Sequence, residues 1–267
     1  MNPFTDEAFR REHGSYLCNV KPGLAPVRGR PGTCDVCGAP LQDYSICYPC
    51  HTVREASSRS GTPFPLAHLA FLTYTAEWGE QVQPECRRDG RQAYTVLKGY
   101  KSPQSSRFIA QATRWAGWFL GRWAPWEVPL GGPGRDGWAW ATVPTTHRER
   151  SGEHPLHRIV TALLGAETEA QVQALRVSDG RSYDPALYEC SGVAGMPVLI
   201  VEDSWVSGMS VFSLGAALRQ AGATTVCAMV LGRTLNPGRW SPAADFINSG
   251  GLRLEFDPSL SPWTKVR

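Results

Sequence analysis

The fold is decided by one segment, VLIVEDSWVSGMS, which runs from Val198 to Ser210. Its first four residues are apolar without alternation, which is typical of a strand covered on both faces in a parallel sheet. Two carboxylates, Glu202 and Asp203, follow this strand, and Gly208 lies just before a helical pattern over 209–221. We therefore predict a strand, a tight turn and a helix, the first parts of a βαβ unit.

The pattern outside this segment also alternates between strands and helices. Apolar runs predict strands over 69–74, with 93–97 continuing the same element, and over 138–143 and 225–231. Apolar residues at three- and four-residue steps predict a helix over 105–123, and further helices are predicted over 156–164 and, as a second short one, 168–175. The predicted fold class is α/β, with a doubly wound parallel sheet.

The turn after the central strand has the composition of an anion site. A helix N-terminus offers unpaired N–H groups, Gly208 lets the backbone approach an oxygen closely, and Ser207 and Ser210 add hydroxyl donors. The neighbouring carboxylates would repel a phosphate, so we expect them to face sugar hydroxyls or a Mg²⁺ ion held by a diphosphate. A ribose 5-phosphate that carries a diphosphate meets both requirements. The competing interpretation is an ordinary turn in which a serine caps the helix and the acids face solvent.

Four of the eight cysteines form two close pairs, Cys34-Asp-Val-Cys37 and Cys47-Tyr-Pro-Cys50. Each pair places two thiolates on one tight turn, so together they predict a tetrahedral zinc site of the structural kind, closed to substrates. Two disulfides, or His51 in place of Cys50, are the alternatives. A stretch rich in Ser, Gly and Pro over 57–65 predicts a boundary. It would separate a zinc-ribbon-like module with an irregular lead-in (1–60) from a larger domain (61–267).

The composition excludes several classes of protein. A hydrophobic content of 42% argues against a disordered chain, and we find neither a membrane-spanning run nor an N-terminal signal sequence. We expect a soluble, cytoplasmic protein. The net charge of +3, from 27 basic and 24 acidic residues, is far from that of a dedicated nucleic-acid binder. Eight cations nonetheless accompany one anion between Arg87 and Trp123, a segment that either faces phosphates or is a solvated surface.

The residues on both sides of the turn resemble a known family. Glu202-Asp203 followed by Ser207-Gly208-Met209-Ser210 is similar to the motif with which type I phosphoribosyltransferases bind 5-phosphoribosyl 1-diphosphate (PRPP). The resemblance extends to the ComF family, whose members begin with a four-cysteine zinc module. Three further matches follow the family's order: Leu97-Lys98-Gly99-Tyr100-Lys101, Val143-Pro144 with Arg148, Arg150 and Gly152 downstream, and Gly222-Ala223-Thr224-Thr225-Val226.

The resemblance implies roles for individual residues. Asp203 and Glu202 would be the catalytic carboxylates that hold the ribose hydroxyls. The 5-phosphate would be bound by Ser204, Val206, Ser207, Gly208, Met209 and Ser210. Pro144, Thr145 and Thr146 would form the diphosphate loop, with charge added by His147 and Arg148. A mobile covering loop is expected between 176 and 191, a variable hood over about 66–130, and the core of the domain over about 137–250.

Two main functions remain open on this basis, beside a third in which the zinc module is a scaffold and the pocket is inactive. The first is a phosphoribosyltransferase of nucleotide metabolism, which binds PRPP with Mg²⁺ and transfers phosphoribosyl to or from a nitrogenous base, with diphosphate as leaving group. The second is a non-catalytic competence or DNA-uptake adaptor, or a nucleotide sensor, whose basic segment 87–122 binds single-stranded DNA or a DNA-processing protein. His147, His154 and His157 suggest either phosphate contact, which we favour, or a second metal or acid–base site.

Overall fold

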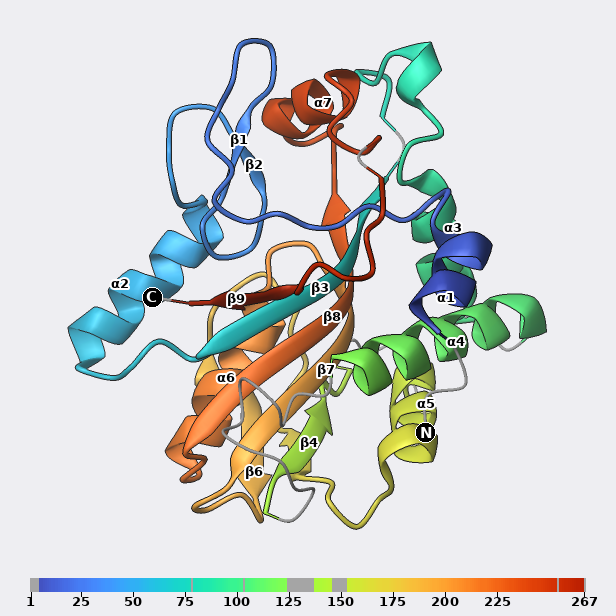
Figure 1. Ribbon diagram of the computed structural model, residues 1–267. Coiled ribbons are helices and arrows are strands. Elements are labelled where there is room, and N and C mark those ends of the chain that lie inside the picture. Colours follow the sequence, from blue (N-terminus) through green and yellow to red (C-terminus); the bar gives the residue numbers. More distant parts are fainter. Residues whose placement is uncertain are drawn as a thin grey trace.

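A five-stranded sheet forms the centre of the protein in the computed structural model, which describes residues 5–77, 79–102, 104–123, 137–145, 153–253 and 255–266. The strand order is β4-β7-β8-β3-β9 (Figure 1). Four strands are parallel: β3 (His68–Ala76), β4 (Ala139–Thr142), β7 (Pro197–Trp205) and β8 (Thr225–Leu235). The short β9 (Trp263–Lys265) pairs antiparallel with β3 at one edge. The predicted α/β class with a mostly parallel sheet is confirmed.

Both faces of this sheet are covered, because successive residues of its strands enter two different cores. Leu199 and Val201 of β7 pack in one core with residues of α1 (Asp6–His13), α3 (Arg91–Gly99), α4 (Ser106–Arg122) and α5 (Pro155–Leu164). Val198 and Ile200 pack in the other, with residues of α2 (Tyr48–Ser60), α6 (Met209–Gln220) and α7 (Ser241–Asn248). Figure 1 shows α3, α4 and α5 on one side of the sheet and α2 and α6 on the other.

The predicted helix over 105–123 is confirmed as α4, and its tryptophans are core residues. Trp115, Trp118 and Phe119 are all buried, and the ring of Trp118 stacks on that of Phe9 with centroids 4.0 Å apart. The recurrence of large apolar residues at three- and four-residue steps therefore marks the face that α4 turns to the sheet. These rings leave no aromatic platform for a ligand on this helix face.

Two sequence predictions of secondary structure are wrong. Residues 93–97 lie in α3, where Ala93, Val96 and Leu97 share one buried face at helical spacing. Residues 168–175 are not a helix, because β5 (Gln171–Ala174) pairs antiparallel with β6 (Tyr188–Ser191). The helix-forming residues of that segment are overridden by tertiary pairing. The remaining short elements are β1 (Gly32–Thr33) and β2 (Pro40–Leu41), which pair with each other, and the 3₁₀ turns η1 (Pro84–Cys86) and η2 (Pro185–Leu187).

The central strand is longer than its apolar run. β7 continues through Glu202 and Asp203 to Trp205, and within this extension Asp203 and Trp205 are buried whereas Glu202 and Ser204 are partly exposed. The two carboxylates therefore belong to the strand and point to opposite faces of the sheet. Within the described residues, no helix is both long and apolar enough to cross a membrane.

Candidate functional site

A cavity of about 440 Å³ opens at the carboxyl ends of β4, β7 and β8, the end of a parallel sheet where ligands commonly bind. It brings together predicted site residues from two segments: Pro144, Thr145, Glu202, Asp203, Ser204, Val206, Ser207, Gly208, Met209 and Ser210. Thr146, His147 and Arg148 lie outside the described residues. The ligand roles assigned to these residues from the sequence stay predictions.

The turn between β7 and α6 is shaped by Gly208, which takes the left-handed conformation with φ of 81° and caps the helix. A Cβ atom there would lie 2.1 Å from Cζ2 of Trp205, so the ring of Trp205 also requires glycine. The Ser207 hydroxyl accepts a hydrogen bond from the N–H of Met209 at 3.4 Å. The first turn of α6 lines the cavity, and the N-terminal end of a helix favours anions.

Asp203 is held on the α3 side of the sheet by three side chains. Its carboxylate accepts hydrogen bonds from the buried Tyr100 hydroxyl and from Lys101 Nζ, which lies 3.1 Å from Oδ1 and 2.9 Å from Oδ2. His154 Nε2 lies 3.6 Å from Oδ2. Burial would raise the pKa of Asp203, but the charge of Lys101, helped by His154 and Tyr100, lowers it to about 2. Asp203 is 1% exposed and, with this low pKa, is ionised at neutral pH, so it holds these side chains in the cavity wall.

Glu202 points to the opposite face and stands in a different environment. Its Oε1 accepts the N–H groups of Asp203 and Ser204, at 2.9 and 3.4 Å. Burial and the neighbouring charge of Asp203 raise the pKa of Glu202 to about 8. Since this side chain is only half-buried and lines the cavity, it is the more accessible of the two carboxylates.

The segment predicted as a covering loop lies against the start of α6. The N–H of Asp184 donates to the hydroxyl of Ser213 at 2.9 Å, and a Cβ atom at Gly180 would lie 2.9 Å from Oγ of Ser210. Arg176 and Asp184 pair across the base of the segment. Part of the predicted loop is β6, but Asp179, Gly180 and Arg181 do line the cavity.

Several residues of the cavity were not assigned a role from the sequence. They are Glu77, Lys101, Asn236 and Arg239. Lys101 lies in a segment that the family resemblance singled out, but nothing in the sequence pointed to its contact with Asp203. Asn236 follows β8 and donates to Glu77 Oε2 at 2.6 Å, which ties the ends of β8 and β3 together at the rim.

The three predicted histidines do not form one cluster. His154 turns to Asp203, whereas His157 Nδ1 lies 3.2 Å from the Thr142 hydroxyl and its Nε2 lies 3.3 Å from Glu153 and 3.5 Å from Glu169. His147 lies outside the described residues. In the part of the chain that the structure describes, the four cysteines are the one group of His, Cys, Asp or Glu side chains close enough to hold a metal ion.

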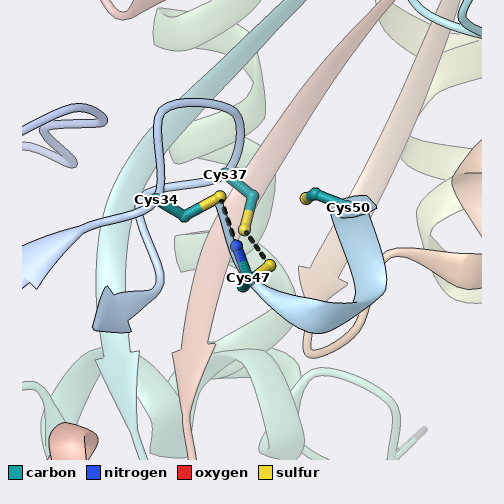
Figure 2. Close-up of side chains that lie close together, drawn as sticks. All are labelled: Cys34, Cys37, Cys47 and Cys50. Carbon is teal, nitrogen blue, oxygen red and sulfur yellow. Dashed lines mark hydrogen bonds between the residues drawn. The ribbon is translucent and has the colours of Figure 1, made fainter. Parts of the chain in front are cut away.

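Those four cysteines form a second site, packed on the sheet through Tyr74, whose hydroxyl donates to the carbonyl of Gly38 at 2.7 Å. The sulfurs of Cys34, Cys37, Cys47 and Cys50 all lie within 4.8 Å of one another, and all four residues are buried (Figure 2). Cys37 and Cys47 have sulfurs 3.6 Å apart, far from the roughly 2.05 Å of a disulfide and close to the roughly 3.8 Å edge of a tetrahedral zinc–thiolate site. All four cysteines are free, so the disulfide alternative is wrong.

The donor set therefore fits a tetrahedral metal ion. Cys50 belongs to the cluster, whereas the half-exposed His51 lies 3.8 Å from Glu55 one helical turn away, so His51 does not replace Cys50. The N–H of Cys47 donates to the sulfur of Cys34 at 3.3 Å, the kind of backbone bond that orients a ligand sulfur. The division of the chain into 1–60 and 61–267 stays a prediction.

Some cations of the basic segment form ion pairs, and others line a groove. Arg114 pairs with Glu12 at 2.8 Å and Arg122 with Asp6 at 2.9 Å, both through acids of α1. A separate groove of about 520 Å³ between α3 and α4 is lined by Arg88, Arg91, Gln92, Thr95, Val96, Arg107, Phe108 and Gln111. The guanidinium of Arg107 lies 4.5 Å from the ring centre of Phe108. No acidic side chain lines this groove in the described part of the chain.

Comparison with known proteins yields only distant likenesses, among solved structures. No family model and no curated protein matches the chain. A solved structure that resembles it is a hypoxanthine phosphoribosyltransferase from Staphylococcus aureus, with 13% sequence identity and a TM-score of 0.24. The match covers 53% of this chain and 65% of that chain, so it spans slightly less than two thirds of the neighbour. At this TM-score the functional assignment depends on the cavity itself.

Proposed function

We propose that the protein binds PRPP with Mg²⁺ in the cavity and transfers phosphoribosyl to or from a nitrogenous base. The observation that carries this proposal is the position of Glu202, an accessible carboxyl group, beside the N-terminal turn of α6 in one cavity. A carboxylate suits sugar hydroxyls and a helix N-terminus suits a phosphate, so a phosphorylated sugar satisfies both. The cavity volume of about 440 Å³ lies within the range of small-ligand sites.

The wall of the cavity suggests how the leaving group is held. Lys101 and His154 line it and are fixed by Asp203, so their N–H groups are placed to donate to a diphosphate. In this proposal Glu202 binds the ribose hydroxyls, whereas Asp203 holds Lys101 in place. Pro144 and Thr145 form the described part of the diphosphate loop. Mg²⁺, when bound with the substrate, would neutralise the diphosphate oxygens.

The proposed reaction is a displacement at C1 of the ribose. A nitrogen of the acceptor forms a bond to C1 as the bond from C1 to the diphosphate oxygen breaks, and diphosphate departs with the electron pair. Catalysis then consists mainly of alignment and of stabilising the leaving group. We further propose that the cysteine cluster holds zinc and is structural, because four protein sulfurs leave no coordination position open for a substrate.

Thermal unfolding in the presence of parts of the ligand tests this function. PRPP with MgCl₂ at 100 times its dissociation constant should stabilise the protein by about 2.7 kcal/mol, a rise in Tm of roughly 5 °C or more. Ribose 5-phosphate and diphosphate alone should each give a smaller rise, since each occupies half of the site. The proposal fails if none of the three raises Tm.

The groove between α3 and α4 favours a second candidate function, binding of single-stranded nucleic acid by an adaptor. Arg88, Arg91 and Arg107 line it together with the aromatic ring of Phe108, and cations beside an aromatic ring can hold a phosphate backbone and stack a base. Each phosphate contact with a single strand contributes about 0.7 to the salt slope, so Arg88→Gln with Arg107→Gln should lower the slope by about 1.4. Anisotropy of a labelled oligonucleotide measures it. Arg114→Gln with Arg122→Gln, which remove paired cations, are the matched control. Equal effects of the two pairs would refute the groove as the contact surface.

A further inference from the structure

Arg233, near the end of β8, is a buried cation between the cysteine cluster and the turn that begins α6. The residue is 5% exposed and lies in register with Tyr74 of β3 and Trp205 of β7. It therefore occupies an interior strand of the sheet, close to the edge where the cavity opens. An arginine here is unusual, because charged side chains are seldom fully buried unless a partner compensates the charge.

The contacts of this guanidinium run in two directions. Toward the cluster, its Nε donates to the carbonyl of Cys37 at 2.9 Å, and its Nη2 lies 3.7 Å from the sulfur of Cys37. Toward the cavity, its Nη1 donates to the carbonyls of Trp205 and Val206 at 2.9 and 3.0 Å. The same nitrogen also contacts the carbonyl of Thr234 at 2.8 Å. One side chain thus links a metal-ligand residue to the end of β7.

The hydrogen bonds from Arg233 to the carbonyls of Trp205 and Val206 fix the two residues that precede Ser207. The ring of Trp205 is held as well, edge-on to Phe71 and Phe212 with centroids 5.5 and 5.0 Å apart. The same ring closes on Gly208, where a Cβ atom would overlap it. The turn is therefore held through its backbone by Arg233 and through the Trp205 ring by the core.

The charge of Arg233 needs a compensating group, and the cysteine cluster can supply it. In the described part of the chain, the hydrogen bonds of the guanidinium go to neutral carbonyls and to the Cys37 sulfur. Four thiolates around one divalent ion carry a net charge of −2, so the loaded cluster provides the negative charge that a buried guanidinium requires. Groups that donate to ligand sulfurs also stabilise metal centres in return.

We infer that Arg233 is a positioning residue through which the metal-loaded cysteine cluster sets the geometry of the Trp205–Gly208 turn and hence its affinity for phosphate groups. The identity of the ligand rests on the proposed function, but the order of the turn does not. Loss of the ion frees Cys37, the residue that holds Arg233 on the cluster side, and the two carbonyls of the turn then lose their common donor. Affinity falls although the ion touches no ligand.

Hydrogen exchange of the peptide that spans Trp205 to Ser210 is the primary measurement, made on the full-length protein. Four samples are compared with wild type: Arg233→Met, which keeps the volume but not the charge; Arg233→Lys, which keeps the charge; wild type stripped of metal with a chelator; and Tyr74→Phe. The last is the matched control, because it removes a hydrogen bond to the same cysteine loop without touching the turn. Binding of PRPP with MgCl₂ and the bound-metal content are recorded for each sample.

The inference predicts faster exchange of this peptide in Arg233→Met and in the metal-stripped protein, an intermediate rate in Arg233→Lys, and the wild-type rate in Tyr74→Phe. PRPP affinity should fall about 10- to 100-fold in Arg233→Met and in the metal-stripped protein, the range typical of residues that orient a site without touching the bound group. Should Arg233→Met fail to fold, Arg233→Lys and the metal-stripped protein decide the matter. An unchanged rate, or faster exchange spread equally over α4, overturns the inference. Failure of wild type to bind PRPP refutes the proposed function alone, since the exchange rates still decide this one.

Discussion

Replacing Gly208 with alanine is expected to damage both stability and ligand binding, because two independent constraints meet at this residue. The backbone there has φ of 81°, a conformation that L-residues rarely adopt. The added Cβ would also lie 2.1 and 2.2 Å from two atoms of the Trp205 ring, which is buried and packed on its other sides by Phe71 and Phe212. The ring therefore has no space into which it can move.

The magnitude follows from adding the two effects. A left-handed backbone costs a non-glycine residue roughly 1–2 kcal/mol. Forcing an extra carbon into a packed region costs roughly a further 1–3 kcal/mol. Gly208→Ala should therefore lower the free energy of unfolding by about 2–5 kcal/mol.

Gly61→Ala separates the two effects. Gly61 caps α2 with φ of 67°, but nothing lies within 4 Å of the position that its Cβ would take. Gly61→Ala therefore introduces the backbone strain without the steric clash. Both variants also gain the same stability from the lower conformational entropy of the unfolded chain. Urea unfolding should show Gly208→Ala to be less stable than Gly61→Ala by about 1–3 kcal/mol. Equal losses in the two variants would refute the packing of Trp205 against the turn.

Three further predictions concern the carboxylates and the cysteines. Because Glu202 has a pKa of about 8 in the folded protein and about 4.5 when exposed, the stability it contributes when protonated is lost as the pH rises through this interval. Urea unfolding of Glu202→Gln should thus show it gaining stability relative to wild type between pH 5 and pH 8, and parallel curves would contradict the shift. Asp203→Asn removes the buried partner of Lys101 and should lower the free energy of unfolding by about 3 kcal/mol at pH 7. This difference should shrink as the pH falls from about 4 toward 2, where Asp203 of the wild type takes up a proton. A difference that does not change with pH would exclude the ion pair. Cys47→Ser should lower the bound metal well below one ion per chain by elemental analysis, whereas Cys227→Ser, outside the cluster, should leave one; equal metal contents would exclude the site.

The local parts of the site could be predicted from the sequence, because local patterns carry them. The apolar run before Glu202, the glycine at 208 and the helical spacing after it are all contained in one short segment, and the structure places them as strand, turn and helix. The two C-x-x-C pairs likewise carry their spacing in the chain itself, and their sulfurs do meet. In both cases the decisive geometry is set by residues close in sequence.

The rest depends on contacts between distant residues. The environment of Asp203 is made by Tyr100 and Lys101, about a hundred residues earlier, and by His154, and no periodicity relates them. In the sequence, Arg233 is one polar residue in an apolar strand. Only the fold brings Cys37 and Trp205 into contact with it. Residues 171–174 have helix-forming neighbours, yet they become a strand because β6 is available to pair with them.

The extension of β7 shows the same limit in a different way. An apolar run that ends at Val201 indicates that the strand ends there, yet the backbone ladder with β8 continues to Trp205. Polar residues continue the strand because Asp203 finds partners on one face and Glu202 faces the cavity on the other. Hydrophobicity alone therefore places the end of this strand too early, because the strand continues through polar residues.

Calorimetric titration of PRPP with MgCl₂ at pH 9, above the pKa of about 8 of Glu202, is the most direct test of this cavity. Wild type, Glu202→Gln, Ser207→Ala and Glu55→Gln are compared. Glu55 is an exposed carboxylate on α2 that does not line the cavity, so it controls for loss of a charge elsewhere. We predict micromolar binding by wild type and Glu55→Gln and at least tenfold weaker binding by Glu202→Gln and Ser207→Ala. Binding that is equal in all four proteins, or absent from wild type, would contradict the assignment of this cavity.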